Sequence, residues 1–193
     1  MKIKDAAAEF LGQKRIAVTG VSRTPKSHGS NIVYERLRAR GYQVFAVNPN
    51  AETVEGDTAY LELKSIPDGV DAVVIGTRPE IAEQTMRECV DLGIKLVWMH
   101  RGPGRGSVSD AATQYGRAHG ITVIDGGCPL MFAPTADGGH KVMKALLRST
   151  AKRGASWQAA SECSGRSTSS SRPICRRRSS STPRTISPRR AGR

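Results

Sequence analysis

Residues 15–29 read RIAVTGVSRTPKSHG, a short apolar run followed by a polar loop that ends in glycine. The apolar run at 15–21 is typical of a buried strand, and a helical pattern begins at residue 31. Further apolar runs, separated by helical stretches, follow at 43–47, 70–76, 95–99 and 121–124. Strands that are apolar throughout and alternate with helices indicate a parallel sheet covered on both faces. We therefore predict an α/β, Rossmann-like doubly wound parallel sheet of about five strands.

Composition divides the chain into a predicted domain at 1–150 and a tail at 151–193. A leading helix is expected at 4–11 and a closing helix at 139–148. The formal net charge is +13, but the tail holds 11 basic residues and one acidic residue. A Ser/Arg-rich segment without apolar periodicity buries too little surface to order itself, so the tail is predicted to be disordered. The charge therefore argues against a nucleic-acid surface on the domain, although RNA binding through the tail stays open.

Several absences limit the class of protein that we expect. The sequence contains no run of about 18 apolar residues, the length that a membrane-spanning helix needs. No apolar segment of the secretory type follows Met1. The spacing of the 4 cysteines fits neither a zinc site nor a CxxC redox pair. We therefore expect a cytoplasmic protein without a membrane segment or a metal site.

The loop after the first strand carries the strongest candidate site. Ligands of doubly wound sheets bind at the carboxyl ends of the strands. In this loop, backbone N–H groups at a helix start, hydroxyls and basic side chains together favour a phosphate. The candidate residues are Gly20, Val21, Ser22, Arg23, Lys26 and Ser30. The glycines do not follow the G-x-G-x-x-G dinucleotide pattern, and an ordinary polar loop is the alternative.

Two further strand ends add candidate ligand residues. Asn48 and Pro49 follow the second strand, where a dehydrogenase usually carries the acidic residue that holds the ribose of NAD. Thr77, Arg78 and Pro79 follow the third, and a guanidinium there suits a phosphate. A plain Asn-Pro turn and a surface arginine paired with an acidic neighbour are the alternatives. The glycine-rich loop at 101–106 either lines the ligand site or simply forms a turn.

No catalytic residue is predicted. Cys128 is interpreted as a small residue in a turn, because no His or Asp can be placed beside it from sequence. His28 and His140 likewise lack an assignable carboxylate partner, and a lone histidine is more often structural.

The pattern of segments resembles the stand-alone CoA-binding domain proteins, which are similar to the nucleotide-binding domain of the succinyl-CoA synthetase alpha subunit. The matching segments are 16–26, 44–49, 71–75, 95–99 and 127–131, within a resemblance that runs from residue 12 to about 150. It implies that 20–26, 48–49 and 77–79 contact the ligand. The second domain of the ligase relatives, with its phosphorylated histidine, has no counterpart here, and the loop after the fourth strand is unusually rich in glycine.

The predicted function is non-catalytic binding of coenzyme A or an acyl-CoA, in a carrier, sensor or regulatory role. An NAD(P)-dependent oxidoreductase is the alternative, and a protein that binds RNA through its tail is a third. The expected partner is the small molecule itself, with no membrane or nucleic acid. The sequence leaves open whether the chain forms a homodimer and whether free CoA or its thioester is preferred.

Overall fold

The computed structural model describes residues 2–24, 29–102 and 106–136, which form a sheet covered by helices. The sheet order is β3-β4-β2-β1-β5-β6-β7. Its strands are β1 (Arg15–Thr19), β2 (Gln43–Val47), β3 (Thr53–Val54), β4 (Asp57–Tyr60), β5 (Ala72–Ile75), β6 (Leu96–Met99) and β7 (Thr122–Asp125). The described helices are α1 (Ile3–Leu11), α2 (Gly29–Arg38), α3 (Pro79–Asp91) and α4 (Asp110–Ala118). All pairings are parallel except β3 with β4, so the predicted doubly wound parallel sheet is confirmed.

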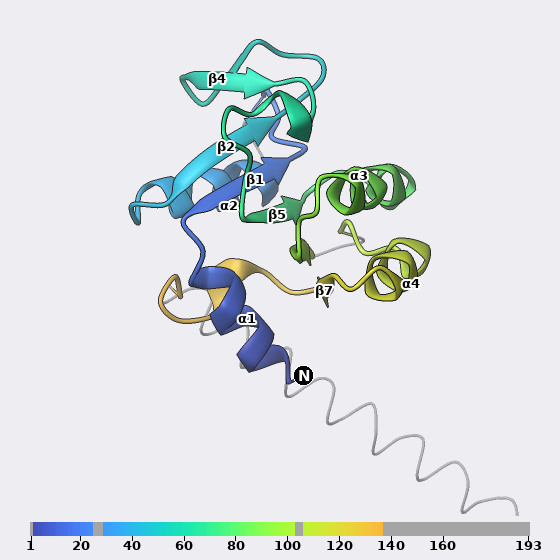
Figure 1. Cartoon of the computed structure of the whole chain (residues 1–193). Helices are drawn as coiled ribbons and strands as arrows, with labels where there is room; N and C mark the ends of the chain where they lie inside the picture. The colour runs from blue at the N-terminus through green and yellow to red at the C-terminus, as the bar shows by residue number, and fades with distance from the viewer. Residues whose placement is uncertain (1, 25–28, 103–105, 137–193) are drawn as a thin grey trace, which may run out of the picture. The chain divides into compact units, whose positions relative to one another are not determined.

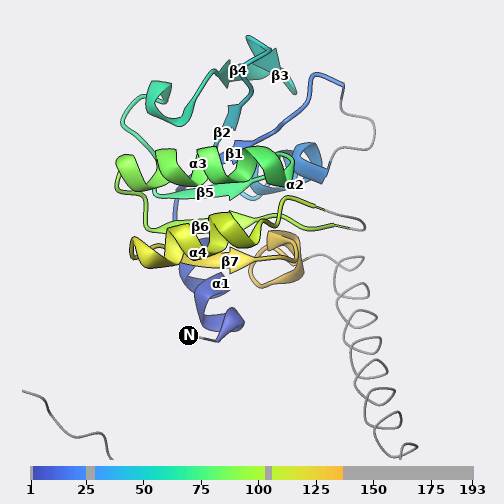
Figure 2. The ribbon, with the colours of Figure 1, turned by 90° about the vertical axis from the view of Figure 1, so that its right-hand side faces the viewer.

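Both faces of the central strands are buried because side chains alternate between two apolar clusters. On β5, Val74 joins the cluster that contains α1 and α2, whereas Val73 joins the cluster with α3 and α4. Figure 1 and Figure 2 show the resulting layers, with α3 and α4 together on one face of the sheet. This two-sided burial is why the strands have nearly continuous apolar sequences.

Trp98 of β6 is the centre of the first cluster. It is fully buried, and its ring meets those of Phe10 and Phe132 edge to face at centroid distances of 5.4 Å. Its indole Nε1 donates a hydrogen bond of 3.0 Å to the carbonyl oxygen of Gly126. Trp98 therefore ties α1 and the segment after β7 to the sheet.

The structure has two strands more than the five that the sequence predicts. β3 has 2 residues and β4 has 4, which is too few to show a period. They are joined by Glu55 and Gly56, whose φ angles of 49° and 82° match a two-residue hairpin turn. The expected closing helix at 139–148, His28, His140 and the tail from residue 151 lie outside the described residues.

Candidate functional site

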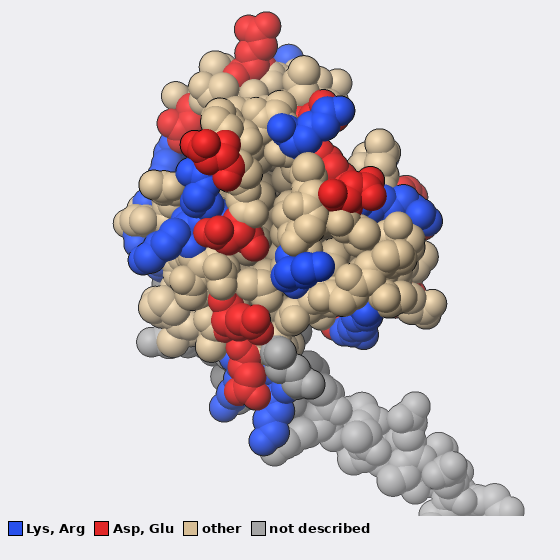
Figure 3. Space-filling model, in the orientation of Figure 1, with Lys and Arg blue, Asp and Glu red and all other residues tan. Residues whose placement is uncertain are grey.

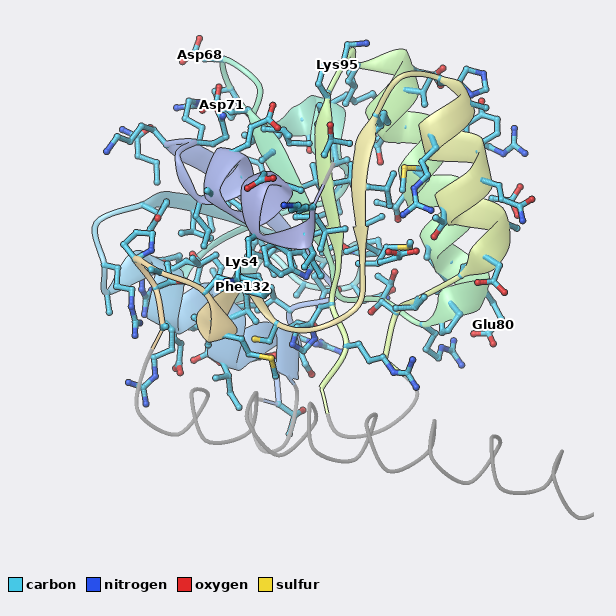
Figure 4. All side chains as sticks on the ribbon, turned by 90° about the horizontal axis from the view of Figure 1, so that it is seen from below. Lys4, Asp68, Asp71, Glu80, Lys95 and Phe132 are labelled. Atoms are coloured by element: carbon cyan, nitrogen blue, oxygen red, sulfur yellow. The ribbon has the colours of Figure 1, made fainter. Side chains whose placement is uncertain are left out.

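The candidate site lies at the edge of the sheet where the parallel strands end. From β1 the chain crosses to β2 on one side and later returns to β5 on the other, which makes the β1–β5 gap the switch point of the strand order. Figure 4 shows the two edges: Asp71 and Lys95, which precede β5 and β6, lie together, and Glu80, which follows β5, lies at the opposite end. The loops that contain the predicted residues therefore share one edge.

Two glycines bring the ends of β1 and β5 into contact. Gly20 has φ +74°, and a Cβ atom on it would lie 2.8 Å from the carbonyl carbon and oxygen of Gly76. A Cβ atom on Gly76 would lie 2.2 Å from Ser30 Oγ and 2.6 Å from the carbonyl oxygen of Thr19. Larger residues at either position would push the two loops apart.

Hydrogen bonds also join the two strand ends. The backbone N–H of Gly76 donates to Thr19 Oγ1 at 3.2 Å, and Ser30 Oγ donates to the carbonyl oxygen of Gly76 at 3.1 Å. The predicted ligand residue Ser30, in the first turn of α2, thus joins this helix to the loop after β5.

Side-chain amides hold the start of the loop after β1. Asn31 Oδ1 accepts a 2.8 Å hydrogen bond from the N–H of Ser22, and Asn31 Nδ2 donates one of 2.8 Å to the carbonyl oxygen of Ser22. Asn48 Nδ2 donates to the carbonyl oxygen of Val21 at 2.7 Å. The N–H of Thr24 donates to Ser22 Oγ at 3.1 Å. The loop therefore has a fixed start that needs no ligand.

A cavity of about 330 Å³ opens beside this loop, within the usual size range of small-molecule sites. The predicted residues Ser30, Thr77 and Arg78 line it. Thr77 Oγ1 is buried and has no hydrogen-bond partner among the described residues. A buried hydroxyl in that state keeps its capacity to bond a ligand atom.

The other predicted residues that the structure describes do not line the cavity. Arg23 and Pro49 are exposed, and Pro79 is the first residue of α3. The side chain of Val21 is fully buried in the core, so only its backbone can reach a ligand. Both ends of the Asn48 amide are used, because Oδ1 accepts a 2.8 Å bond from the N–H of Asn50. Lys26 lies outside the described residues.

The loop after β6, for which the sequence left open a place beside the ligand or a plain turn, contributes to the wall of the cavity. His100, which is 8% exposed, and Ser107, 2% exposed, line the cavity with Gly102 and Gly106. A Cβ atom on Gly29 would lie 2.7 Å from His100 Cε1, so the loop packs closely against the start of α2. Ser109, not Ser107, caps α4, its Oγ accepting from the N–H of Ala112 at 3.3 Å. Ser107 instead belongs to the cavity wall.

A larger hollow of about 470 Å³ lies at the other edge of the sheet. Lys14 and Tyr42 line it, and they immediately precede β1 and β2. No ligand loop of the doubly wound fold reaches that edge. We therefore assign the function to the smaller cavity at the switch point.

The helix α2 also fixes the β3–β4 hairpin that flanks the site. Tyr34 OH donates to Asp57 Oδ2 at 2.7 Å, and Arg38 forms an ion pair with the same carboxylate. Burial, followed by the hydrogen bond to Asp57, raises the pKa of Tyr34. The hydrogen bond from Tyr34, with help from Arg38, lowers the pKa of Asp57. These side chains keep the hairpin against α2.

Charge and composition of the described part limit its partners. On the face shown in Figure 3, Lys and Arg side chains are interspersed with Asp and Glu. Within residues 2–24, 29–102 and 106–136, no three His, Cys, Asp or Glu side chains gather into a group that could hold a metal ion. None of the helices described is long and apolar enough to cross a membrane.

Comparison with known proteins places most of the described chain in a known family. Residues 14–134 match the CoA binding domain family. The alpha subunit of acetate–CoA ligase (ADP-forming) II from Pyrococcus furiosus is 35% identical over 88 residues, which are 46% of this chain and 19% of the subunit. The acetate–CoA ligase (ADP-forming) II from Archaeoglobus fulgidus is 38% identical over 84 residues, 42% of this chain and 12% of the ligase. The chain thus spans less than a fifth of either curated relative.

Solved structures of other proteins share the fold of this chain. A hypothetical protein from Pyrococcus horikoshii OT3 is 27% identical with a TM-score of 0.61, covering 67% of this chain and 88% of its own. A Thermus thermophilus protein is 26% identical with a TM-score of 0.57, covering 68% of this chain and 95% of its own. Both matches cover most of a small protein, so the domain described here also occurs without the rest of a ligase.

Proposed function

Because the chain belongs to the CoA-binding domain family, we propose that it binds coenzyme A or an acyl-CoA at the carboxyl edge of its sheet without transforming it. The observation that carries the proposal is the convergence of the start of α2 with the loops after β5 and β6 on one cavity at the switch point. The cavity walls carry a guanidinium, an imidazole and hydroxyls, groups that bond phosphate, carbonyl and amide oxygens.

The phosphates of the ligand are assigned to the loop after β1 and the start of α2. Arg23 is exposed on this loop, and the amino end of a helix such as α2 offers backbone N–H groups without intrahelical partners and a positive dipole end. Arg78 lies across the cavity at the start of α3. Lys26, in the same loop by sequence, is assigned the same role.

The end of β2 supports CoA over NAD. The ribose diol of NAD is usually held by a carboxylate at this position. Asn48 stands there instead, and its amide is bonded to the carbonyl oxygen of Val21 and the N–H of Asn50. The ribose of CoA carries a phosphate, and a site without a carboxylate at this point does not repel it.

The setting of the protein is part of the proposal. We place the binding domain at residues 1–150, the basic segment at 151–193 outside it, and the protein in the cytoplasm. Cys89 is a free and buried cysteine, which suits a reducing compartment. The biological role that follows is to carry CoA, to sense it or to be regulated by it.

Calorimetric titration of the full chain with CoA, acetyl-CoA, NAD and NADP tests the proposal. We expect saturable CoA binding that weakens about 10- to 100-fold in Arg23→Ala and in Lys26→Ala, as for the loss of one charged hydrogen bond. The matched control is Arg87→Ala, which removes an arginine paired with Glu83 along α3 and should bind normally. No CoA binding at millimolar ligand would refute the proposal, and binding of NADP instead would favour an oxidoreductase.

A further inference from the structure

One face of α2 connects the loop after β1 to the β3–β4 hairpin. Asn31, Tyr34 and Arg38 are three and then four residues apart, so they lie on the same side of the helix. Tyr34 bonds Asp57, and Arg38 donates to the carbonyl oxygen of Glu55 at 3.0 Å. Asn31 Nδ2 donates to Glu55 Oε1 at 2.6 Å. Of the three, Asn31 is the one that also holds the loop.

Asn31 uses its whole amide in these contacts. The side chain is 1% exposed, and its Oδ1 faces the N–H of Ser22 while Nδ2 faces the carbonyl oxygen of Ser22 and Glu55. A backbone N–H can only donate, and a carbonyl or carboxylate oxygen can only accept. The partners therefore fix which end of the amide is oxygen, and no flipped arrangement satisfies them.

We propose that Asn31 is a positioning residue that holds the start of the loop after β1, at Ser22, in the shape that binds the ligand phosphates. The inference rests on the proposed function, because it assigns to Asn31 the ordering of that loop. Asn31 pairs with both backbone polar groups of Ser22, as a neighbouring strand would. A loop that is ordered before binding loses no further conformational freedom when the ligand binds, so the affinity for the ligand is higher.

Substitution of aspartate separates the donor role of the amide from its shape. Asn31→Asp keeps an acceptor for the N–H of Ser22. Its second carboxylate oxygen, however, takes the place of the donor Nδ2 and faces two acceptors, the carbonyl oxygen of Ser22 and the carboxylate of Glu55. We expect CoA affinity to fall by about tenfold or more and the melting temperature to fall as well. Adding Glu55→Gln gives the new carboxylate a donor across the hairpin contact, while the carbonyl oxygen of Ser22 stays unpaired.

The double variant therefore distinguishes positioning from stability. Asn31→Asp with Glu55→Gln should regain melting temperature without regaining CoA affinity. Tyr34→Phe is the matched control, because it removes a hairpin bond from the same helix face and leaves the loop untouched; it should melt lower and bind CoA normally. Full recovery of affinity in the double variant, or equal weakening in Tyr34→Phe, would overturn the proposal, as would CoA affinity of Asn31→Asp within twofold of the unmodified protein.

A measurement without ligand separates this inference from the proposed function. In Asn31→Ala the N–H of Ser22 loses its acceptor, so amide hydrogen exchange should accelerate at Ser22 while the β1 amides at residues 16–18 keep their protection. Unchanged exchange at Ser22 would refute the positioning role even if the protein binds CoA. Faster exchange in a protein that never binds CoA would instead refute the proposed function and leave the loop contact standing.

Discussion

Replacing Gly20 by alanine tests whether the contact between β1 and β5 shapes the site. The new methyl group would have to occupy a residue with φ +74° and would lie 2.8 Å from the backbone of Gly76 and 2.9 Å from the nitrogen of Thr77. The left-handed conformation costs an alanine about 1–2 kcal/mol. The overlap with a backbone, which cannot move aside as a side chain can, adds about 1–3 kcal/mol. We therefore expect Gly20→Ala to lower the free energy of unfolding by about 2–5 kcal/mol.

Gly41 provides the control for this prediction. Its φ is +81°, close to that of Gly20, but a Cβ atom on it would meet nothing within 4 Å. Gly41→Ala should therefore show only the conformational cost of about 1–2 kcal/mol. The difference between the two variants measures the close contact alone.

The free energy of unfolding of both variants is measured by urea denaturation, followed by far-ultraviolet circular dichroism. The slopes of the two transitions are compared to confirm that the unfolded states are alike. Gly20→Ala should also bind CoA more weakly, because the loop after β1 must shift away from β5. Equal losses of unfolding free energy in Gly20→Ala and Gly41→Ala would show that the contact carries no energy, and the reasoning would fail.

Three further predictions concern other parts of the domain. The lowered pKa of Asp57 means that its contribution to stability is present at neutral pH and is lost progressively as pH falls below about 4. Asp57→Asn should therefore lower the melting temperature at pH 7, and this loss should shrink as pH falls below about 4. Phe10→Ala empties a fully buried site against Trp98 and should cost about 3–5 kcal/mol in urea denaturation, whereas Ile3→Ala, at a side chain 55% exposed, should cost almost nothing. Burial raises the pKa of the Cys89 thiol, so mass-spectrometric mapping after treatment with a thiol reagent at pH 8 should find Cys89 modified only once the protein is unfolded.

The sheet could be predicted from the sequence wherever its signal is local. Residues 43–47 coincide with β2, and the other central strands are found within a few residues, because burial on both faces requires an apolar run. The β3–β4 hairpin could not be found in this way. It is held by side chains of α2, with Tyr34 bonding Asp57 across 23 positions of the chain, and its strands of 2 and 4 residues are too short to show a period.

The place of the site could be predicted, but the use of its side chains could not. A parallel sheet brings the ends of β1, β2 and β5 to one edge whatever the residues there are. Whether an amide faces a ligand or a neighbouring backbone depends on contacts between distant segments, as for Asn31 with Ser22. His100 and Ser107 were not named as ligand residues, because a local pattern does not reveal that β6 lies beside β5, which brings the loop after β6 to the cavity.

Asn48 shows how loop shape and ligand choice are linked at this edge. The sequence places an amide where a dehydrogenase carries an acid, and the structure shows that this amide bridges two segments, donating to the carbonyl oxygen of Val21 and accepting from the N–H of Asn50. A carboxylate in its place would keep the second bond, lose the first, and repel the Val21 carbonyl oxygen. The acid that would favour the NAD ribose would therefore loosen the start of the loop assigned to the phosphates. Residue 48 cannot be changed toward one ligand without changing the shape of the site for every ligand.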